Sequence, residues 1–222
     1  MDIILIIAIL TLPAIAQALI SVRYKKYSKI ENGAQLCGFE VARKILDANG
    51  LNEMDIVATP GYLTDHYDPS RKVVRLSQAN FDGTDVAAMA VAAHECGHAI
   101  QDKEGYFMMK LRSAIVPVVK IGTGLSYIII TIGFIFELLN VIYIGIALTG
   151  LGLLFQIITL PVEFNASSRA GKQLELLGLS SEEDSRGIKK VLGAAAMTYV
   201  AGMLSTLLMI LRYVLIFSGR RD

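Results

Sequence analysis

The sequence predicts a mainly α-helical integral membrane protein with about four transmembrane helices, a helical region between them and a short β-hairpin. Two observations carry this prediction. The 222 residues are 54% hydrophobic and 18% charged, whereas an average soluble domain has about 45–50% apolar and about 25% charged residues. The apolar residues are also gathered into four long runs. This composition excludes an intrinsically disordered chain, because disorder requires low hydrophobicity and high net charge.

The four apolar runs have lengths that suit a lipid bilayer. They are residues 3–21, about 121–136, 141–162 and about 194–211. The first run is 19 residues without a charge, and as a helix it would cover about 28 Å of the ~30 Å hydrocarbon core. The second run is short and needs its flanking residues to reach membrane length, so a buried core helix stays open as its alternative.

The charges around the first run favour a retained membrane anchor over a cleaved signal peptide. Ala14-Ile15-Ala16 resembles a cleavage site, but the residue before the run is Asp2 rather than a cation. Four cations follow the run: Arg23, Lys25, Lys26 and Lys29. Because positive flanks stay in the cytoplasm, we expect the chain after residue 21 to be cytoplasmic.

The remaining polar stretches suggest five parts. These are an N-terminal transmembrane anchor (1–21), a cytoplasmic region (22–113), a transmembrane hairpin (114–162), a connector (163–192) and a C-terminal transmembrane helix with its tail (193–222). Within the cytoplasmic region we expect a helix over 40–48, a strand–turn–strand over 57–63 and 72–76, and a helix over 86–102 capped by Thr84 or Asp85. Within the connector we expect one helix from 163 to 177 and the start of another at 180–183.

Net charge and cysteine content argue against a nucleic-acid-binding protein and against a disulfide-rich protein. The formal net charge is +1, so no basic surface argues for a nucleic-acid partner. Two cysteines, Cys37 and Cys96, cannot build a disulfide framework. The partner that composition supports is the lipid bilayer.

The clearest chemical motif is His94-Glu95-Cys96-Gly97-His98. Histidines four residues apart lie on one face of a helix, so both imidazoles can bind one Zn²⁺ ion. Glu95 can take a proton from water on that zinc, which also polarises the carbonyl under attack. With only three histidines in the chain, a chance match is expected about once in several hundred such chains. The alternative is a pair of ordinary helix histidines.

A catalytic zinc needs three protein ligands and an open fourth position, so a third ligand must come from elsewhere. The extended form of the motif, with a glycine and a third histidine, is absent because Gln101 and Glu104 occupy those positions. Glu163 stands where the third apolar run should return to the cytoplasm, on the side expected for His94. Spacing alone leaves open that Glu163 is only an acid at a helix N-terminus.

Four longer motifs carry a resemblance to a known family. They are Asp65-His66-Tyr67-Asp68-Pro69, Val91 to Gln101, Leu160 to Ala170, and Ala194 to Val200. Nearly end to end, the chain resembles the YugP-type family of bacterial membrane zinc metallopeptidases, and more distantly the HtpX-like and CaaX-processing membrane proteases. The resemblance implies a zincin-like helical domain in a multi-pass protein of the bacterial inner (plasma) membrane. The cations after the first run place its site at the cytoplasmic face.

The resemblance also implies roles for individual residues. In the distant relatives a Glu-x-x-Ala-Asp helix supplies the third zinc ligand, and Glu163-x-x-Ala166-Ser167 matches it except for the serine. The expected zinc ligands are therefore His94, His98 and Glu163, with Glu95 as the general base.

Other residues near these motifs are candidates for weaker roles. His66 or Tyr199 could stabilise the oxyanion, and Asn165 or Arg169 could orient substrate or support a ligand. The strand expected over 72–76 could bind a peptide by edge addition.

These observations predict a membrane-anchored zinc metalloendopeptidase that acts on a protein or peptide substrate, either membrane-associated or unfolded. The alternative is a membrane scaffold or interaction protein with a structural or vestigial zinc site. Glu95 argues against the scaffold, because a structural zinc site needs no base. The sequence indicates neither an oligomeric state nor a regulatory partner.

Overall fold

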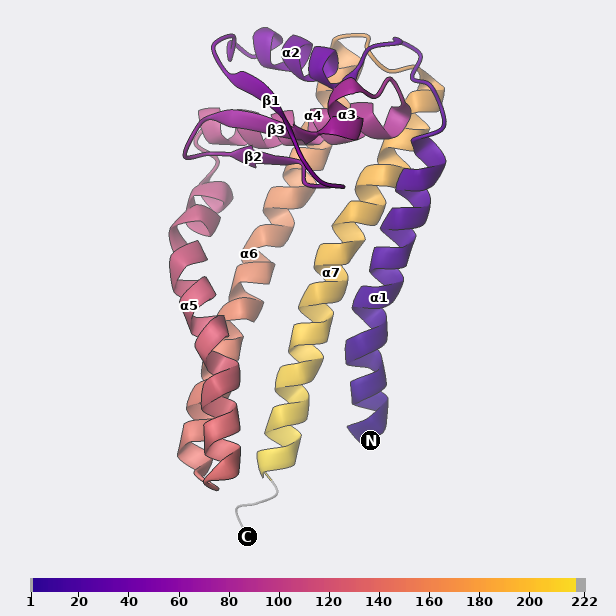
Figure 1. The fold of residues 1–222 in the computed structure, drawn as a ribbon. Helices are drawn as coiled ribbons and strands as arrows, with labels where there is room; N and C mark the ends of the chain where they lie inside the picture. The colour runs from indigo at the N-terminus through magenta and orange to yellow at the C-terminus, as the bar shows by residue number, and fades with distance from the viewer. Residues whose placement is uncertain (1, 219–222) are drawn as a thin grey trace. The chain divides into compact units, whose positions relative to one another are not determined.

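The structure is a computed structural model that describes residues 2–218, and the described chain is mainly helical (Figure 1). Its elements are α1 (Asp2–Tyr27), α2 (Gly38–Ala48), β1 (Asp55–Thr59), β2 (His66–Asp68), β3 (Val73–Ser77), α3 (Gln78–Asp82), α4 (Val86–Lys103), α5 (Phe107–Ile135), α6 (Leu139–Leu176) and α7 (Glu182–Ser218). Residues 219–222 of the expected C-terminal tail lie outside the described residues.

Four of these helices, α1, α5, α6 and α7, are long and apolar enough to cross a membrane. These four candidate spans match the four apolar runs of the sequence. The second span is longer than its run, because α5 has 29 residues and includes the polar residues before Pro117. Backbone hydrogen bonding therefore extends the helix well beyond the apolar window that predicted it.

The described chain divides into two compact units. We call the first the helical unit: it comprises the residues up to Gln17, Lys110–Pro161 and the residues from Met197 onward. We call the second the α/β unit: it comprises Ala18–Met109 and Val162–Ala196. Each long helix contributes residues to both units.

Within the helical unit the helices pack in two visible pairs, α1 beside α7 and α5 beside α6 (Figure 1). The Ser205 hydroxyl donates to the Ile9 carbonyl at 2.8 Å, and Arg212 Nε lies 2.7 Å from Asp2 Oδ1. Gly145 allows α6 to approach α5, since a Cβ there would meet Ile130 N at 3.0 Å. Many outward side chains are large and apolar, as a helix surface in contact with hydrocarbon requires.

In the α/β unit, β3 is the central strand of a sheet with the order β1-β3-β2. β1 pairs with β3 in parallel and β2 pairs with it antiparallel. The predicted hairpin of residues 57–63 and 72–76 is therefore wrong in its first strand: β2 and β3 form the hairpin. Pro60 and Gly61, the latter at φ +111°, end β1 after Thr59.

The central position of β3 also corrects the expectation that residues 72–76 could bind a peptide by edge addition. β3 is paired with β1 along its full length on one side and with β2 at residues 73–75 on the other, so it is not an edge strand that a peptide could extend. The sheet edges belong to β1 and β2.

Helix α4 lies in the core of the α/β unit and contacts α2, α3, β2 and β3. Its first turn is capped by Asp85, whose Oδ1 accepts a hydrogen bond from the Ala88 N–H at 2.9 Å. Asp85 is one of the two residues predicted to cap this helix. The helix is rich in alanine, which favours the helical backbone and lets neighbouring elements approach closely. The His-Glu-x-x-His motif therefore stands on a well-buried, rigid helix.

Helix α6 continues without a break from Leu139 to Leu176, with Pro161 inside it. The expectation that a new helix begins at Glu163 is therefore wrong. A stripe of fully buried residues at four-residue spacing, Val162, Ala166, Ala170 and Leu174, keeps one helical face in the core beyond the proline. Because Glu163 lies inside a helix, its alternative as an acid at a helix N-terminus is excluded.

Helix α7 begins at Glu182, close to the predicted start. The Asp184 N–H donates to Ser181 Oγ at 3.1 Å, and the Ser181 N–H donates back to the Asp184 carboxylate at 2.9 Å. These reciprocal bonds satisfy backbone donors at the helix start. The helix then runs on to Ser218 as one element, so the expected final span is its second part rather than a separate helix.

Candidate metal centre

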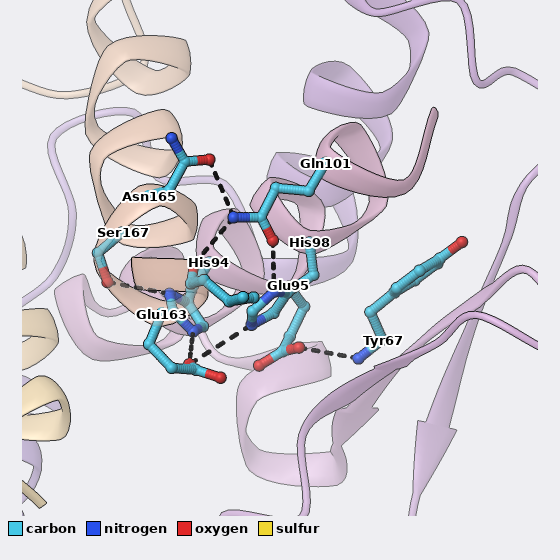
Figure 2. A network of polar contacts seen from close by, with 9 residues as sticks. Tyr67, His94, Glu95, His98, Gln101, Glu163, Asn165 and Ser167 are labelled. Carbon is cyan, nitrogen blue, oxygen red and sulfur yellow. Dashed lines mark hydrogen bonds and ion pairs between the residues drawn. The ribbon is translucent and has the colours of Figure 1, made fainter. Parts of the chain in front are cut away.

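Two histidines and one glutamate converge in the α/β unit. His94 and His98 come from α4 and Glu163 comes from α6, and one ligand atom of each lies within 4.8 Å of the others. Glu163 Oε2 is 3.3 Å from His94 Nε2 and 3.6 Å from His98 Nε2. Figure 2 shows both imidazole rings directed at the Glu163 carboxylate. Glu163 and His98 are only 3% and 7% exposed, so the cluster is largely shielded from solvent.

A close backbone contact brings Glu163 to the histidines. A Cβ atom on Gly97 would lie 2.5 Å from the Ala166 carbonyl oxygen, which is far inside van der Waals contact. Only glycine at this position of the motif lets α4 and α6 approach so closely. Ala166 is one helical turn beyond Glu163, so the same approach places the carboxylate opposite His94 and His98.

The donor set and its spacing fit a zinc ion. Zinc sites with three protein ligands and one open position commonly use two histidines and one glutamate. Ligand atoms about 2.0–2.2 Å from a tetrahedral zinc lie roughly 3.4 Å from one another. The Nε2–Oε2 distances of 3.3 and 3.6 Å match that spacing, and all three ligand atoms lie within 4.8 Å of one another, so the donor set fits a zinc ion.

Glu95 lies beside the cluster and is held by the sheet (Figure 2). Its Oε2 accepts a hydrogen bond of 2.8 Å from the backbone N–H of Tyr67, which belongs to the edge strand β2. The side chain is 7% exposed. A buried carboxylate fixed by one oxygen next to three candidate metal ligands is well placed to exchange a proton with a bound water molecule.

The negative charges around the cluster act on His98. Burial lowers the pKa of His98, but its contact with Glu163 and the charges of Glu95 and Glu163 outweigh burial and raise the pKa above its ordinary value. The carboxylates of Glu95 and Glu163 therefore favour a positive charge at this position. A divalent cation would satisfy the same electrostatic demand.

The Nδ1 atom of each histidine has its own partner. Ser167 Oγ lies 3.2 Å from His94 Nδ1, and Gln101 Oε1 lies 3.0 Å from His98 Nδ1. Ser167 thus stands where the distant relatives implied by the resemblance carry an aspartate. The sequence analysis did not identify Gln101 as a site residue, although its position three residues after His98 puts it on the same helix face.

The two candidate oxyanion residues, His66 and Tyr199, belong to different units of the chain. His66 is exposed on β2, and its Nδ1 lies 2.8 Å from the Thr64 carbonyl oxygen. Tyr199 belongs to the helical unit, whereas the cluster belongs to the α/β unit. Both roles stay predictions.

Asn165 and Arg169, the candidates for orienting or supporting roles, belong to a polar network beside the cluster. Arg169 Nε donates to Asn165 Oδ1 at 2.7 Å, and the Arg169 guanidinium pairs with Glu104 at 2.7 Å. This ion pair ties Arg169 of α6 to Glu104 at the C-terminal end of α4. Asn165 in turn contacts Gln101, the residue that touches His98.

A pocket of about 750 Å³ lies beside the cluster, between residues of α6 and α7 in the α/β unit. Phe164 and Ser167 line it, and both flank the candidate metal ligands. Leu174, Ile188 and Leu192 contribute an apolar wall.

Comparisons with known proteins agree with this chemistry. The family described as "Putative neutral zinc metallopeptidase" matches residues 2–218 of the chain. "Putative membrane protease YugP" of Bacillus subtilis (strain 168) is 45% identical over 218 residues, which cover 98% of this chain and 97% of that protein. No solved structure matches the chain. The similarity extends over the membrane-spanning helices as well as the cluster.

Proposed function

Since the chain belongs to this family of neutral zinc metallopeptidases, we propose that it is a membrane-anchored zinc metalloendopeptidase. It would hydrolyse peptide bonds in membrane-associated or unfolded proteins, with its site on the cytoplasmic side of the membrane. The observation that carries the proposal is the convergence of His94, His98 and Glu163 with Glu95 held beside them. The cations after the first apolar run support the cytoplasmic side.

His94, His98 and Glu163 would hold the metal, and the helix pair α4 and α6 would form a zincin-like arrangement around it. Zinc bound there would lower the pKa of a bound water to about 7 and polarise the scissile carbonyl. Three protein ligands would leave the fourth coordination position of the zinc for water or substrate. A zinc site with four protein ligands has no open position and is typical of a structural site.

Glu95 would move the protons. Its carboxylate accepts the proton of the attacking water, and the same group then delivers a proton to the nitrogen of the departing amine. The Tyr67 N–H holds Glu95 Oε2 at 2.8 Å, which limits the rotation of the carboxylate. The backbone of β2 thereby positions the base without occupying both of its oxygens.

The proposal predicts that proteolysis depends on zinc. The detergent-purified full-length protein is expected to cleave casein, to lose that activity when a chelator removes the metal, and to regain it on addition of zinc. The measurement is the rate of casein cleavage together with the zinc content of each sample. About one zinc per chain and restored cleavage would support the peptidase.

Two outcomes would contradict it. Cleavage that survives complete removal of the metal would show that another catalytic group, or a contaminating protease, is responsible. A protein that binds about one zinc per chain yet cleaves neither casein nor itself in any lipid tested would favour the membrane scaffold with a structural zinc site.

A further inference from the structure

We propose that Gln101 is a positioning residue that fixes the orientation of His98 and joins the two helices that carry the candidate zinc ligands. This inference rests on the metal centre of the proposed function, but it does not depend on peptide hydrolysis. Gln101 is fully buried, so its amide must find all its partners within the protein.

The amide of Gln101 makes three hydrogen bonds (Figure 2). Its Oε1 lies 3.0 Å from His98 Nδ1. Its Nε2 donates to the Val162 carbonyl oxygen at 2.8 Å and to Asn165 Oδ1 at 2.9 Å. A side-chain amide has two N–H donors, so both are used. His98 is on α4, whereas Val162 and Asn165 are on α6 beside Glu163.

The partners allow only one orientation of this amide. A carbonyl oxygen such as that of Val162 cannot donate, so it must face the NH₂ group of Gln101. Asn165 presents its oxygen as well, because that oxygen also accepts from Arg169 Nε at 2.7 Å. With its nitrogen fixed by two acceptors, Gln101 must turn its oxygen toward His98.

The orientation of Gln101 determines which ring nitrogen of His98 is available to a metal. In the neutral imidazole that binds a metal, an oxygen facing Nδ1 requires that Nδ1 carry the hydrogen, which leaves the lone pair of Nε2, on the side of Glu163, for the metal ion. Histidines that bind a metal are commonly oriented by a hydrogen bond from their second nitrogen. Gln101 thus selects the tautomer and the ring position that zinc binding requires.

The same contacts form a closed ring between the two helices. From α4, Gln101 reaches Asn165, which receives Arg169, and Arg169 returns to Glu104 at the end of α4 through a 2.7 Å ion pair. A change in the spacing of α4 and α6 would break this ring. Gln101 therefore couples the position of Glu163 to that of His98.

The test measures zinc binding rather than catalysis. Gln101→Met keeps the length and burial of the side chain but removes all three hydrogen bonds. The zinc dissociation constant of the folded full-length protein, from competition with a chelator, is expected to rise about 10–100-fold. The visible spectrum of the cobalt-substituted protein is expected to shift, because the ring of His98 is no longer held in place.

Gln101→Glu is the informative partner variant, because it returns an acceptor to His98 Nδ1 without the two donors. It is expected to bind zinc more tightly than Gln101→Met. Met89→Leu, a conservative change at another fully buried position of α4, controls for core packing and should leave the zinc dissociation constant unchanged. If Gln101→Met does not fold, Gln101→Glu is compared directly with the wild type.

A role in packing alone would give a different result. In that case Gln101→Met would lower the melting temperature of the metal-free protein and leave the zinc dissociation constant within about twofold, against the 10–100-fold expected for a lost ligand partner. That result, or a glutamate variant no better than the methionine variant, would overturn the inference. A wild type that binds zinc but cleaves no peptide would contradict only the proposed function, whereas one that binds no zinc would overturn both.

Discussion

Replacing Glu95 with glutamine is expected to abolish casein cleavage while the zinc content stays at the wild-type level. Glutamine has nearly the same shape and can still lie beside Tyr67, but it cannot accept a proton from water. General acid–base catalysis of this kind contributes about 10²–10⁴-fold to a rate. Because Glu95 is not among the three converging ligands, its replacement leaves the set of metal ligands intact. Cleavage rates at matched zinc content measure the effect.

Glu53→Gln is the matched control for this experiment. Glu53 is an exposed carboxylate of the same α/β unit, outside the cluster, so the same change of charge there should leave both cleavage and zinc content unaltered. Equal cleavage by the wild type and Glu95→Gln would show that Glu95 is not the base. A variant that also loses its zinc would instead show that Glu95 takes part in holding the metal.

Substituting alanine for Gly97 is expected to weaken zinc binding by about 100-fold. The new methyl group would lie 2.5 Å from the Ala166 carbonyl oxygen, and both partners are helix backbone that cannot turn aside. Helix propensity alone would favour alanine by about 1 kcal/mol, but overpacking costs roughly 1–3 kcal/mol. The helices must move apart, and a misplacement of about 1 Å in a site can cost about 10²-fold. Chelator competition measures the loss.

Gly150→Ala provides a matched control, because Gly150 lies on α6 and a Cβ there meets no atom within 4 Å. It should leave the zinc dissociation constant unchanged and slightly stabilise the helix. A Gly97→Ala protein that binds zinc as tightly as the wild type would show that the spacing of α4 and α6 does not determine the position of Glu163.

The elements that the sequence predicted well are those specified by local signals. The apolar runs identified four membrane-spanning helices, and the Asp85 cap and the alanine-rich run identified α4. The His-Glu-x-x-His spacing placed two imidazoles on one helix face without any tertiary information. Glu163 was found because the order of membrane segments put it on the side of His94, and the structure brings their ligand atoms within 4.8 Å.

The errors came from features that only tertiary contacts decide. The helix break expected near Pro161 does not occur, because the buried stripe through Ala166 continues the helix across the proline. Strand β2 has only three residues, too few to show an alternation of apolar and polar side chains. The sequence therefore predicted that residues 57–63, rather than β2, form the hairpin with β3. The roles of Gly97 and Gln101 depend on Val162 and Ala166 of α6, which lie more than sixty residues away in sequence from both.

The most direct test of the account is X-ray absorption spectroscopy at the zinc edge on the purified, zinc-loaded protein. We expect a first coordination shell of nitrogen and oxygen only, at about 2.0–2.2 Å, with the scattering pattern of two imidazoles. This shell should lose an oxygen donor of the protein in Glu163→Ala, provided that variant still retains metal. A sulfur scatterer at about 2.3 Å, or a shell without imidazole, would contradict the assignment of His94, His98 and Glu163 as the zinc ligands.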